Sequence, residues 1–433
     1  MIEEAPKRKG RKNFSIFLEE KMVQFIKQIN DEYLYWDKLK YKQIPVSGYT
    51  SEDVWQAVKL VREIDMRFVR FGKYKFGFYQ SDKIFEMLHN LDLNVGGLLG
   101  TKELVTDEDK VKYQVSSIME EAIASSQIEG ANTTRVKAKE MLRKEIKPRT
   151  KAEKMIVNNF TTIRHIVTNK DIELTKEELL EIHSLVTLDT LEDKENEGRF
   201  RQNNDVVVSN SVDGEIVHYP PDFSEIEELI EDVCAFFNNN DNSKFFVHPI
   251  VKGIIIHFMI AYIHPFVDGN GRTARALFYW YLLKNNYWLT EYLSISRMIY
   301  RSKAQYEKAY LYSEHDENDI TYFINYNLRV ITLAYSELKT YLQRKMNEKQ
   351  AVVRYSMVNG INIRQSQIIR DFEQDKNMLA TVKDMCNKFM VSNQTAQTDL
   401  LGLVEKGFLD IVMNKKQRVF IRSENFDELL RLK

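Results

Sequence analysis

The sequence predicts a mostly α-helical protein with two short β-hairpins, and three observations support this fold class. Apolar residues recur at helical spacing along much of the chain, for example over Val251–Ile263 (VKGIIIHFMIAYI). Only 16 glycines and 7 prolines interrupt 433 residues, of which 43% are hydrophobic. Clear β signals occur in two places, around residues 206–219 and 408–422. A chain of this length has room for two or three domains.

The first residues, MIEEAPKRKGRK, are polar and basic and contain no apolar stretch of the kind found in signal peptides. We therefore expect residues 1–13 to form a disordered tail and the protein to be cytoplasmic. Residues 14–110 are rich in Tyr, Phe, Trp and charged side chains, which indicates an N-terminal helical subdomain. No apolar run is long enough to span a membrane. Two cysteines, Cys234 and Cys386, exclude a disulfide framework and a cysteine-rich metal site.

Residues 111–345 are predicted to form the main domain, which begins with an amphipathic helix at residues 111–130. Gly130 is suited to the C-cap of this helix. Glu129 then lies in the last turn, where the helix dipole disfavours an anion, so we expect a nearby cation to compensate it. Taken alone, Glu129 would be interpreted as a solvated surface residue. The apolar stripe of the helix consists of Val115, Ile118, Met119, Ile123 and Ile128.

Residues 198–222 (GRFRQNNDVVVSNSVDGEIVHYPPD) carry the clearest β signal of the main domain. The β-branched run at residues 206–208 predicts one strand, Asp213-Gly214 predicts a hairpin turn, and residues 215–219 predict the return strand. Two prolines then end the pairing. From these residues alone, an ordinary surface hairpin is the simplest interpretation.

Residues 264–275 read HPFVDGNGRTAR and lie between two apolar helical segments, Val251–Ile263 and Ala274–Leu283. No fold needs this mixture of a histidine, a carboxylate, an amide, two glycines and two arginines for packing. A site that binds a polyphosphate and transfers one of its phosphoryl groups does need this mixture of residues. His257 lies seven residues before His264, and we interpret it as a core histidine rather than a metal ligand.

Each residue type in this segment has a physical reason to act on a polyphosphate. The two glycines let the backbone approach a ligand, and the start of the following helix offers free N–H groups and the positive end of its dipole. Arg272 and Arg275 are three residues apart, and each can fork onto phosphate oxygens. Asp268 is a hard oxygen ligand suited to Mg²⁺. His264 is the candidate general base because its reference pKa of about 6.5 lies near the working pH.

The remainder of the chain, residues 361–433, differs in character from the main domain, and the charged helix predicted at Glu337–Lys349 is expected to link the two. Three short helices are predicted, followed by a strand, a turn and a second strand over residues 408–422. Gly407 is suited to a C-cap between the last helix and the first strand. The three helices are predicted at Gln365–Phe372, Val382–Phe389 and Gln394–Lys406.

This order of elements resembles a winged helix-turn-helix domain. The resemblance makes Gln394–Leu403 the recognition helix and places Lys415, Lys416 and Arg418 at the tip of the wing. Residues 361–433 hold twelve Lys and Arg and ten Asp and Glu, so the domain is not strongly basic. Winged helices also serve as protein-docking and dimerisation modules. DNA binding, protein docking and a homodimer therefore stay open as interpretations.

The segment HPFVDGNGRTAR resembles the signature of the Fic family, HPFx(D/E)GNGRxxR, and matches it at every defined position. The resemblance implies a Fic-fold helical core and the activity of a protein adenylyltransferase. Such an enzyme transfers AMP from ATP to a Ser, Thr or Tyr hydroxyl on a target protein, or on itself. The resemblance also implies that the protein uses ATP and Mg²⁺.

The family resemblance implies a role for each residue of the segment. His264 takes the proton from the incoming hydroxyl, Asp268 holds Mg²⁺, and Arg275 reaches the γ-phosphate. Asn270 and the backbone of residues 269–272 bind the α- and β-phosphates. The residues expected to form the ATP site are Glu129, Phe266, Gly269, Asn270, Gly271, Arg272, Thr273, Arg275 and Tyr306.

The end of the first helix resembles a second motif of regulated Fic proteins, (S/T)xxxE(G/N). Here the matching residues are Ser125, Glu129 and Gly130. The resemblance implies that Glu129 pairs with Arg275 and blocks productive binding of the γ-phosphate. Because the motif precedes the core, it corresponds to the arrangement with an N-terminal inhibitory helix.

The hairpin at residues 198–222 resembles the flap of Fic proteins, which aligns the target segment by strand addition. Downstream, Tyr306 is expected to line the adenine pocket, with a core tyrosine as the alternative. Ser313 lies near the place where many relatives carry an asparagine, which leaves the nucleotide preference open. The flap residues expected to border the cleft are Val206, Val207, Val208, Val217, His218 and Tyr219.

Two alternative functions remain at this stage. Some Fic proteins use the inhibitory glutamate to position water and remove AMP, so Glu129 could serve a de-AMPylase. The Fic core could also sense a nucleotide for a DNA-binding regulator, although the complete catalytic set with His264 argues against this. Relatives that phosphorylate their targets depart from the GNGR pattern, which is intact here.

Overall fold

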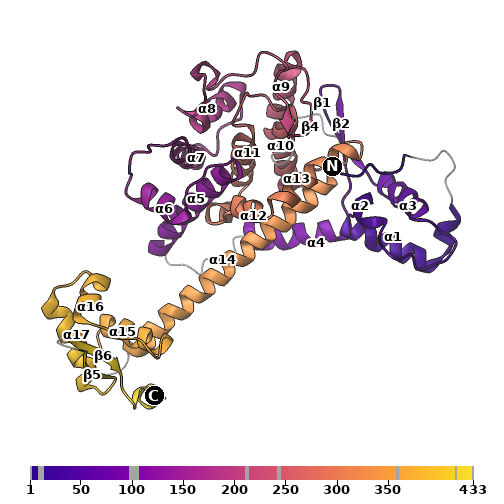
Figure 1. Cartoon of the computed structure of the whole chain (residues 1–433). Coiled ribbons are helices and arrows are strands. Elements are labelled where there is room, and N and C mark those ends of the chain that lie inside the picture. The colour runs from indigo at the N-terminus through magenta and orange to yellow at the C-terminus, as the bar shows by residue number, and fades with distance from the viewer. Residues whose placement is uncertain are drawn as a thin grey trace. The chain divides into compact units, whose positions relative to one another are not determined.

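The computed structural model describes residues 2–7, 14–96, 107–209, 214–240, 245–356, 360–414 and 417–431 (Figure 1). The chain is mostly helical, which confirms the predicted fold class. It divides into two compact units, Met1–Leu338 and Lys339–Lys433. The boundary falls inside one long helix, α14 (Thr321–Ser356), which includes the charged segment predicted as a linker. No described helix is long and apolar enough to cross a lipid bilayer.

The N-terminal part of the first unit is a small helical bundle with its own apolar core. Trp36 and Trp55 lie in this core together with Tyr322 of α14. A capping box between Thr50 and Asp53 starts its third helix. The bundle consists of a 3-10 turn (Phe14–Leu18), α1 (Glu20–Glu32), α2 (Trp36–Leu39) and α3 (Ser51–Ile64).

Residues 2–7 belong to the segment expected to be a disordered tail, but they contact this bundle. Ile2 and Ala5 pack against its core. Trp36 Nε1 donates a hydrogen bond to Glu3 Oε1 (3.2 Å). These apolar and polar contacts hold the short segment although it forms no helix or strand. Residues 8–13 of the same expected tail lie outside the described residues.

A β-hairpin follows the bundle, where only helices were predicted. β1 (Arg67–Phe71) pairs antiparallel with β2 (Tyr74–Phe78). Alternate side chains of the hairpin are buried, and Phe71 and Phe76 contact Phe236 and Phe258 of the central helices. The 14–110 region is therefore a mixed subdomain, which continues with α4 (Asp82–Leu91).

The predicted amphipathic helix at residues 111–130 is present as α5 (Asp107–Ile128). Its apolar residues, including Met119 and Ile123, share a buried cluster with Ile156 of α7. Gly130 has a φ of 90°, as expected for a residue that ends a helix. The helices that pack on one another beside α5 are α6 (Arg135–Arg143), α7 (Lys151–Thr168) and α8 (Lys176–Thr187).

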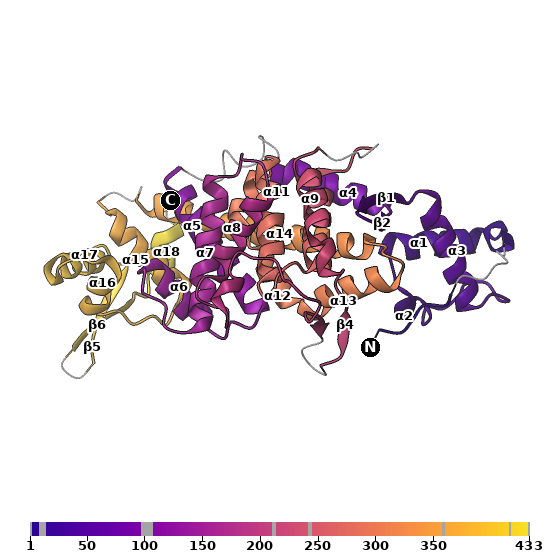
Figure 2. The same cartoon turned by 90° about the horizontal axis from the view of Figure 1, so that it is seen from above.

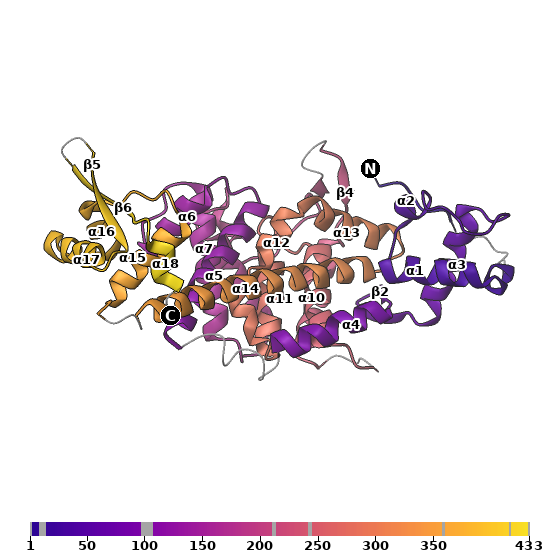
Figure 3. The same ribbon diagram turned by 90° about the horizontal axis from the view of Figure 1, so that it is seen from below.

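Two helices, α10 (Pro249–Ile263) and α11 (Asn270–Lys284), form the centre of the first unit. They pack against each other, and almost every residue of both is buried. An apolar helix of this kind needs neighbours on all sides. These are supplied by α9 (Ile226–Phe237), α7, α8 and the later helices. In Figure 1, α10 and α11 lie between the α5–α8 group and the N-terminal bundle, and Figures 2 and 3 show α11 between α5 and that bundle.

The hairpin predicted at residues 198–222 is shorter than expected. β3 (Val208–Ser209) pairs with β4 (Ile216–His218), with Val208 opposite His218. Val206 and Val207 precede β3, and Tyr219 follows β4 with 71% of its surface exposed. Asp213 of the predicted turn lies outside the described residues. Gly214, the other turn residue, has the positive φ of 73° that such a turn requires.

The last helices of the first unit are α12 (Ile295–Arg301), α13 (Lys303–His315) and the first part of α14. Buried charges join the α13–α14 connection to the N-terminal bundle. Lys59 Nζ of α3 lies 2.8 Å from Asp316 Oδ2 and 3.9 Å from Asp319 Oδ2. Arg62 Nη1 donates to the Tyr322 hydroxyl (2.7 Å). The N-terminal bundle thereby fixes one end of α13.

The second unit has a separate apolar core, to which Ile368, Leu400 and Phe420 contribute. Three helices followed by a hairpin appear in the predicted order, and Gly407 has the positive φ of a C-cap residue. Lys415 and Lys416 lie outside the described residues, so the wing tip and the winged-helix interpretation stay predictions. The elements are α15 (Ile363–Gln374), α16 (Val382–Phe389), α17 (Asn393–Glu405), β5 (Leu409–Asn414), β6 (Gln417–Arg422) and α18 (Phe426–Arg431).

Candidate active site

The candidate site is built around the turn between α10 and α11. His264 caps α10 in a left-handed conformation with a φ of 49°. Gly269, with a φ of 88°, is the N-cap of α11, and this backbone conformation favours glycine. Asn270 Oδ1 accepts a hydrogen bond from the Phe266 N–H (3.0 Å), and its Nδ2 donates to the Phe266 carbonyl (2.8 Å). The Asn270 side chain therefore shapes the turn, and the phosphate contact predicted for Asn270 stays a prediction.

Phe266 anchors the turn in the core, where it is fully buried. Its ring stacks on the ring of His183 in α8 at a centroid distance of 3.6 Å. His183 Nε2 donates to the Asp268 carbonyl (2.8 Å), and its Nδ1 accepts from the Gly198 N–H (3.1 Å), so the ring is neutral. Burial lowers the pKa of His183 to about 4. His183 is a positioning residue that the sequence analysis missed.

Arg201 is a second positioning residue that was missed. It is buried, and its Nε donates to the His264 carbonyl (3.0 Å) while its backbone N–H donates to the Pro265 carbonyl (2.9 Å). The guanidinium also donates to the carbonyls of Asn203 (2.8 Å) and Pro221. One side chain therefore ties the start of the 264–275 segment to both ends of the flap.

The His264 ring is held in one tautomer. Its Nδ1 lies 3.2 Å from the Ala261 carbonyl, which can only accept, so Nδ1 carries the proton and Nε2 is the basic nitrogen. Burial lowers the pKa of His264 to about 4; the positive charges of His218 and Arg201 also lower it, while the carboxylate of Glu129 raises it. The neutral ring is therefore the form present at pH 7.

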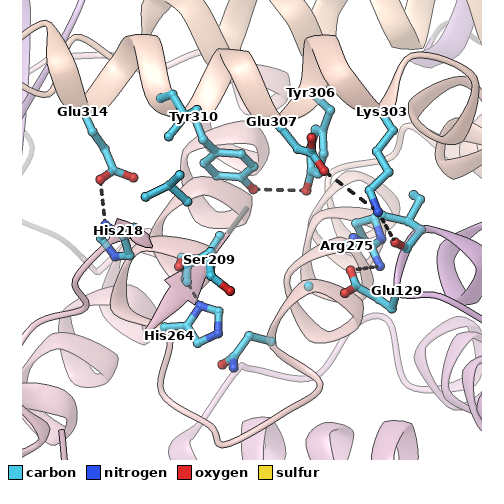
Figure 4. Close-up of a pocket in the computed structure, with 17 residues that line it drawn as sticks. Glu129, Ser209, His218, His264, Arg275, Lys303, Tyr306, Glu307, Tyr310 and Glu314 are labelled. Carbon is cyan, nitrogen blue, oxygen red and sulfur yellow. Dashed lines mark hydrogen bonds and ion pairs between the residues drawn. The ribbon is translucent and has the colours of Figure 1, made fainter. Parts of the chain in front are cut away.

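The predicted pair of Glu129 and Arg275 is present (Figure 4). Arg275 Nη2 donates to Glu129 Oε1 (2.9 Å) and to the Ser125 carbonyl (2.9 Å), and its Nε donates to Ser125 Oγ (2.9 Å). Burial opposes the charge of Arg275, but Glu129 and Tyr306 outweigh it and raise its pKa. The Glu129 carboxylate lies directly over Gly271, where an added Cβ would be 2.2 Å from Oε1.

The cation expected to compensate Glu129 is Arg275, and a second cation, Lys303 of α13, lies at the end of α5. Its Nζ donates to the Ile128 carbonyl (3.0 Å), one of the last carbonyls of the helix. It also lies 3.9 Å from Glu307 Oε1, as Figure 4 shows. Lys303 therefore joins the end of α5 to α13.

Arg272 is fully buried on the other side of the turn. Its Nη1 donates to the Val186 carbonyl (2.9 Å), and its Nη2 lies 3.7 Å from Asp268 Oδ1. Nε and Nη2 have no hydrogen-bond partner among the described residues, and neither does the hydroxyl of the adjacent Thr273. A buried guanidinium with unpaired N–H groups favours an anionic ligand.

A cavity of about 310 Å³ lies between the turn, the flap, α13 and the end of α5. This volume is typical of small-molecule sites. The predicted residues that line the cavity are Glu129, Val208, Val217, His218, His264, Asn270, Gly271, Arg275 and Tyr306. Predicted residues that do not line it are Ser125, Gly130, Val206, Val207, Tyr219, Phe266, Asp268, Gly269, Arg272 and Thr273. Lining residues that were not predicted are Ile128, Ser209, Ala261, Lys303, Glu307, Tyr310, Leu311 and Glu314.

Tyr306 lines the cavity and also belongs to the core behind it. Its hydroxyl lies 2.9 Å from His257 Nε2 and 3.1 Å from the Tyr310 hydroxyl. His257 is fully buried among aromatic rings, in agreement with its interpretation as a core histidine. Ser313 is buried, and its Oγ donates to the Ala309 carbonyl (2.9 Å) rather than facing the cavity.

Asp268 could hold a metal ion only together with a nucleotide. Its side chain is about half exposed, and its Oδ1 accepts a hydrogen bond from the Gly269 N–H (2.5 Å). Within the described part of the chain, no group of three or more His, Cys, Asp or Glu side chains could hold a metal. Mg²⁺ is usually bound by one or two carboxylates plus phosphate oxygens and water, so a single carboxylate fits this ion when phosphates are present.

Comparisons with known proteins agree with this geometry. Residues 173–282 match the model of the Fic/DOC family, and residues 73–147 match a domain of unknown function (DUF4172). "Protein adenylyltransferase Fic" of Drosophila virilis is 31% identical to this chain over 118 residues. The aligned residues cover 27% of this chain and 21% of that protein. The Drosophila melanogaster protein of the same name has the same identity and the same two coverages. The match thus spans about a fifth of the length of these relatives. A Fic family protein from Desulfovibrio desulfuricans G20 shares the fold, with a TM-score of 0.52 and 18% identity over 78% of this chain and 96% of that chain.

Proposed function

Because the chain contains a domain of the Fic/DOC family, we propose that it is a protein adenylyltransferase restrained by Glu129. It would transfer AMP from ATP to a Ser, Thr or Tyr hydroxyl of a target protein, or of itself. The observation that carries the proposal is one cavity that holds both a neutral His264 and the Glu129–Arg275 ion pair. The similarity to relatives named protein adenylyltransferase supports the same reaction class.

The proposed reaction is an in-line displacement at the α-phosphorus of ATP. The target hydroxyl oxygen forms a bond to the α-phosphorus as the bond from that phosphorus to the bridging oxygen of the β-phosphate breaks. AMP remains on the target and pyrophosphate leaves. His264 Nε2 accepts the hydroxyl proton, a role that its neutral state and fixed tautomer support.

The start of α11 supplies donors for the phosphates. Its first backbone N–H groups and the unpaired N–H groups of Arg272 favour an anion at this place. Asp268 would hold Mg²⁺, which would neutralise phosphate charge and orient the leaving pyrophosphate. Gly271 leaves room for a phosphate to approach the backbone closely once Glu129 has moved away.

The restraint acts on Arg275. This guanidinium is the proposed partner of the γ-phosphate, and Glu129 and Ser125 use its donors. A carboxylate at this place also repels the phosphates of ATP. Nucleotide can therefore bind productively only when the ion pair between Glu129 and Arg275 is broken.

The test uses ATP labelled at the α-phosphate, with Mg²⁺ and the full chain as its own acceptor. Glu129→Gly should increase the incorporated label because it frees Arg275. Adding His264→Ala to Glu129→Gly should lower the rate about 10²- to 10⁴-fold, the usual contribution of a general base. Nucleotide binding, measured by calorimetry, should be similar in both variants. Undiminished labelling after His264→Ala would show that His264 is not the base.

Absence of label in every variant would contradict self-modification. A protein carrying AMP on a hydroxyl then distinguishes the alternatives. Release of AMP by wild type that is lost in Glu129→Gly would indicate that Glu129 positions water for removal of AMP.

A further inference from the structure

The ring of His218 contacts an oxygen atom through each of its two nitrogen atoms. Its Nε2 lies 2.7 Å from the Tyr262 carbonyl, and its Nδ1 lies 2.6 Å from Glu314 Oε2. A carbonyl oxygen and an ionised carboxylate are both acceptors, so the two contacts fit a ring that carries a proton on each nitrogen. In that form His218 makes an ion pair with the Glu314 carboxylate. The side chains are largely buried, with 8% and 20% of their surfaces exposed, which favours a strong, charge-assisted contact.

This ion pair joins three walls of the cavity (Figure 4). His218 belongs to β4 of the flap, Glu314 lies on α13, and Tyr262 lies in the last turn of α10, two residues before His264. Val208 of β3 is paired with His218 across the hairpin. A short hairpin with two strands is weak by itself, so its position depends on side-chain contacts of this kind.

The positive charge of His218 also lowers the pKa of His264, the proposed general base. Among the charged groups that face His264, His218 and Arg201 disfavour its protonated form, and Glu129 favours it. Around His218 itself, the Tyr262 ring lies at a centroid distance of 5.0 Å, and Tyr262 in turn faces Tyr74 and the carboxylates of Glu225 and Glu314. Of these groups, only Glu314 forms an ion pair with His218 in the described structure.

We infer that the His218–Glu314 ion pair is a positioning element that holds the flap strand against α13 and keeps His264 ready to accept a proton. The inference rests on the proposed function for its effect on AMP transfer, but not for its effect on the flap. His218 would act through the strand it carries and through His264, without touching the reacting atoms. Breaking the pair should release β4 and slow transfer without weakening ATP binding.

The first experiment needs no enzymatic activity. Amide hydrogen exchange of residues 214–219 is compared in the full-length wild type, His218→Gln and Glu314→Gln. Both variants should exchange faster in this segment, whereas His165→Gln should not. The control residue forms a similar pair with Glu178 (2.8 Å) on α7 and α8, away from the cavity. Unchanged exchange in both test variants would overturn the inference.

Nitrogen NMR of histidine-labelled protein adds a direct readout of the ring. His218, assigned by its loss in His218→Gln, should show two protonated nitrogens at neutral pH, as expected of an imidazolium ion. In Glu314→Gln it should become singly protonated. A singly protonated His218 ring in the wild type would contradict the ion pair.

The second experiment measures self-labelling in the Glu129→Gly background. Adding His218→Gln should lower the maximal rate on the order of tenfold or more, because a displaced acceptor strand misplaces the attacking hydroxyl. The ATP concentration for half-maximal rate should stay within about twofold, since ATP binding is proposed to use other residues.

The acid limb of the pH profile of the labelling rate should move to higher pH, because removing the positive charge of His218 makes His264 easier to protonate. An unmoved limb would overturn the effect on His264. Failure of Glu129→Gly itself to label would contradict the proposed function, and hydrogen exchange would then decide the inference alone.

Discussion

At the residue scale, burial and one hydrogen bond fix the protonation of the His264 ring, the proposed base. The Ala261 carbonyl fixes the proton on Nδ1, and burial disfavours a second proton on Nε2. His183 is neutral for the same reason and supports the turn from behind. Both rings are neutral when folded and regain an ordinary affinity for protons when the chain unfolds.

The lowered pKa of His264 leads to a prediction about pH. In Glu129→Gly, the rate of self-labelling should stay nearly constant from about pH 8 down to about pH 5, because the basic form is lost only as pH approaches 4. A histidine of ordinary pKa would lose half of the rate near pH 6.5. A midpoint close to pH 6.5 would contradict the prediction.

Circular dichroism at each pH supplies the control. Because the pKa values of His183 and His264 are lower in the folded chain, their stabilisation is complete above about pH 6.5 and decreases as pH falls towards 4. Self-labelling rates are compared only at pH values where circular dichroism shows that the protein remains folded.

At the element scale, α5 contributes to the core and to the proposed restraint at once. Its apolar side packs on α7, and Glu121 accepts a hydrogen bond from the Ser296 N–H of α12 (2.9 Å). Only the end of the helix reaches the cavity, which Ile128 and the following residue, Glu129, line. Ser125 and Glu129 both contact Arg275. The helix is therefore anchored by buried contacts along its length, including Ser126 and Ile128 in its last turn.

Lys303 should stabilise the restrained arrangement through this last turn. Lys303→Met keeps the apolar stem and removes the charge at the C-terminus of α5, a contact typically worth about 0.3–1 kcal/mol. We expect self-labelling to rise about two- to fivefold over wild type, less than in Glu129→Gly. Lys308→Met, on the exposed side of α13, is the matched control. A decrease in labelling would instead indicate that Lys303 binds the nucleotide.

At the scale of the whole molecule, the two units have separate apolar cores. Within the first unit, the α3 residues Lys59 and Arg62 meet Asp316 and Asp319 in a buried cluster, so the N-terminal bundle supports the helix that forms one wall of the cavity. A buried charged cluster therefore joins the bundle to the cavity wall, beside the contact of Tyr312 with Asp37.

Removing Lys59 should destabilise the first unit strongly. Lys59→Met leaves two buried aspartates with less compensation, and breaking a buried pair in this way costs about 3–5 kcal/mol. Lys27→Met removes an exposed partner of Asp82 (3.2 Å) and should cost about 0–1 kcal/mol. Urea unfolding followed by tryptophan fluorescence reports this unit, because all four tryptophans lie within it. Equal losses in the two variants would show that the buried cluster contributes little.

The structural features that the sequence predicted are those with local signals. These are the turn between two apolar helices at residues 264–275, the positive φ of Gly130 and the buried side of α5, except that Val115 of the predicted stripe is exposed. The contacts that were missed join residues far apart in the chain, and a single sequence carries no spacing signal for them. They are made by His183, Arg201, Lys303 and Glu314. Arg201 lies inside the predicted flap segment, but no spacing rule indicates that a buried guanidinium donates to three backbone carbonyl groups. The missed hairpin at residues 67–78 did carry a local signal, the alternation RFVRF, which the aromatic composition of the region obscured.

The position of Glu129 over Gly271 has a quantitative consequence. In the proposed reaction, the space above this glycine admits either the carboxylate or a phosphate, so the end of α5 would compete with the nucleotide as a group attached to the same chain. An attached competitor acts at an effective concentration on the order of millimolar and does not change when the protein is diluted. The fraction of molecules open to nucleotide would therefore depend on the nucleotide level and on anything that pulls α5 away, but not on how much of the protein is present.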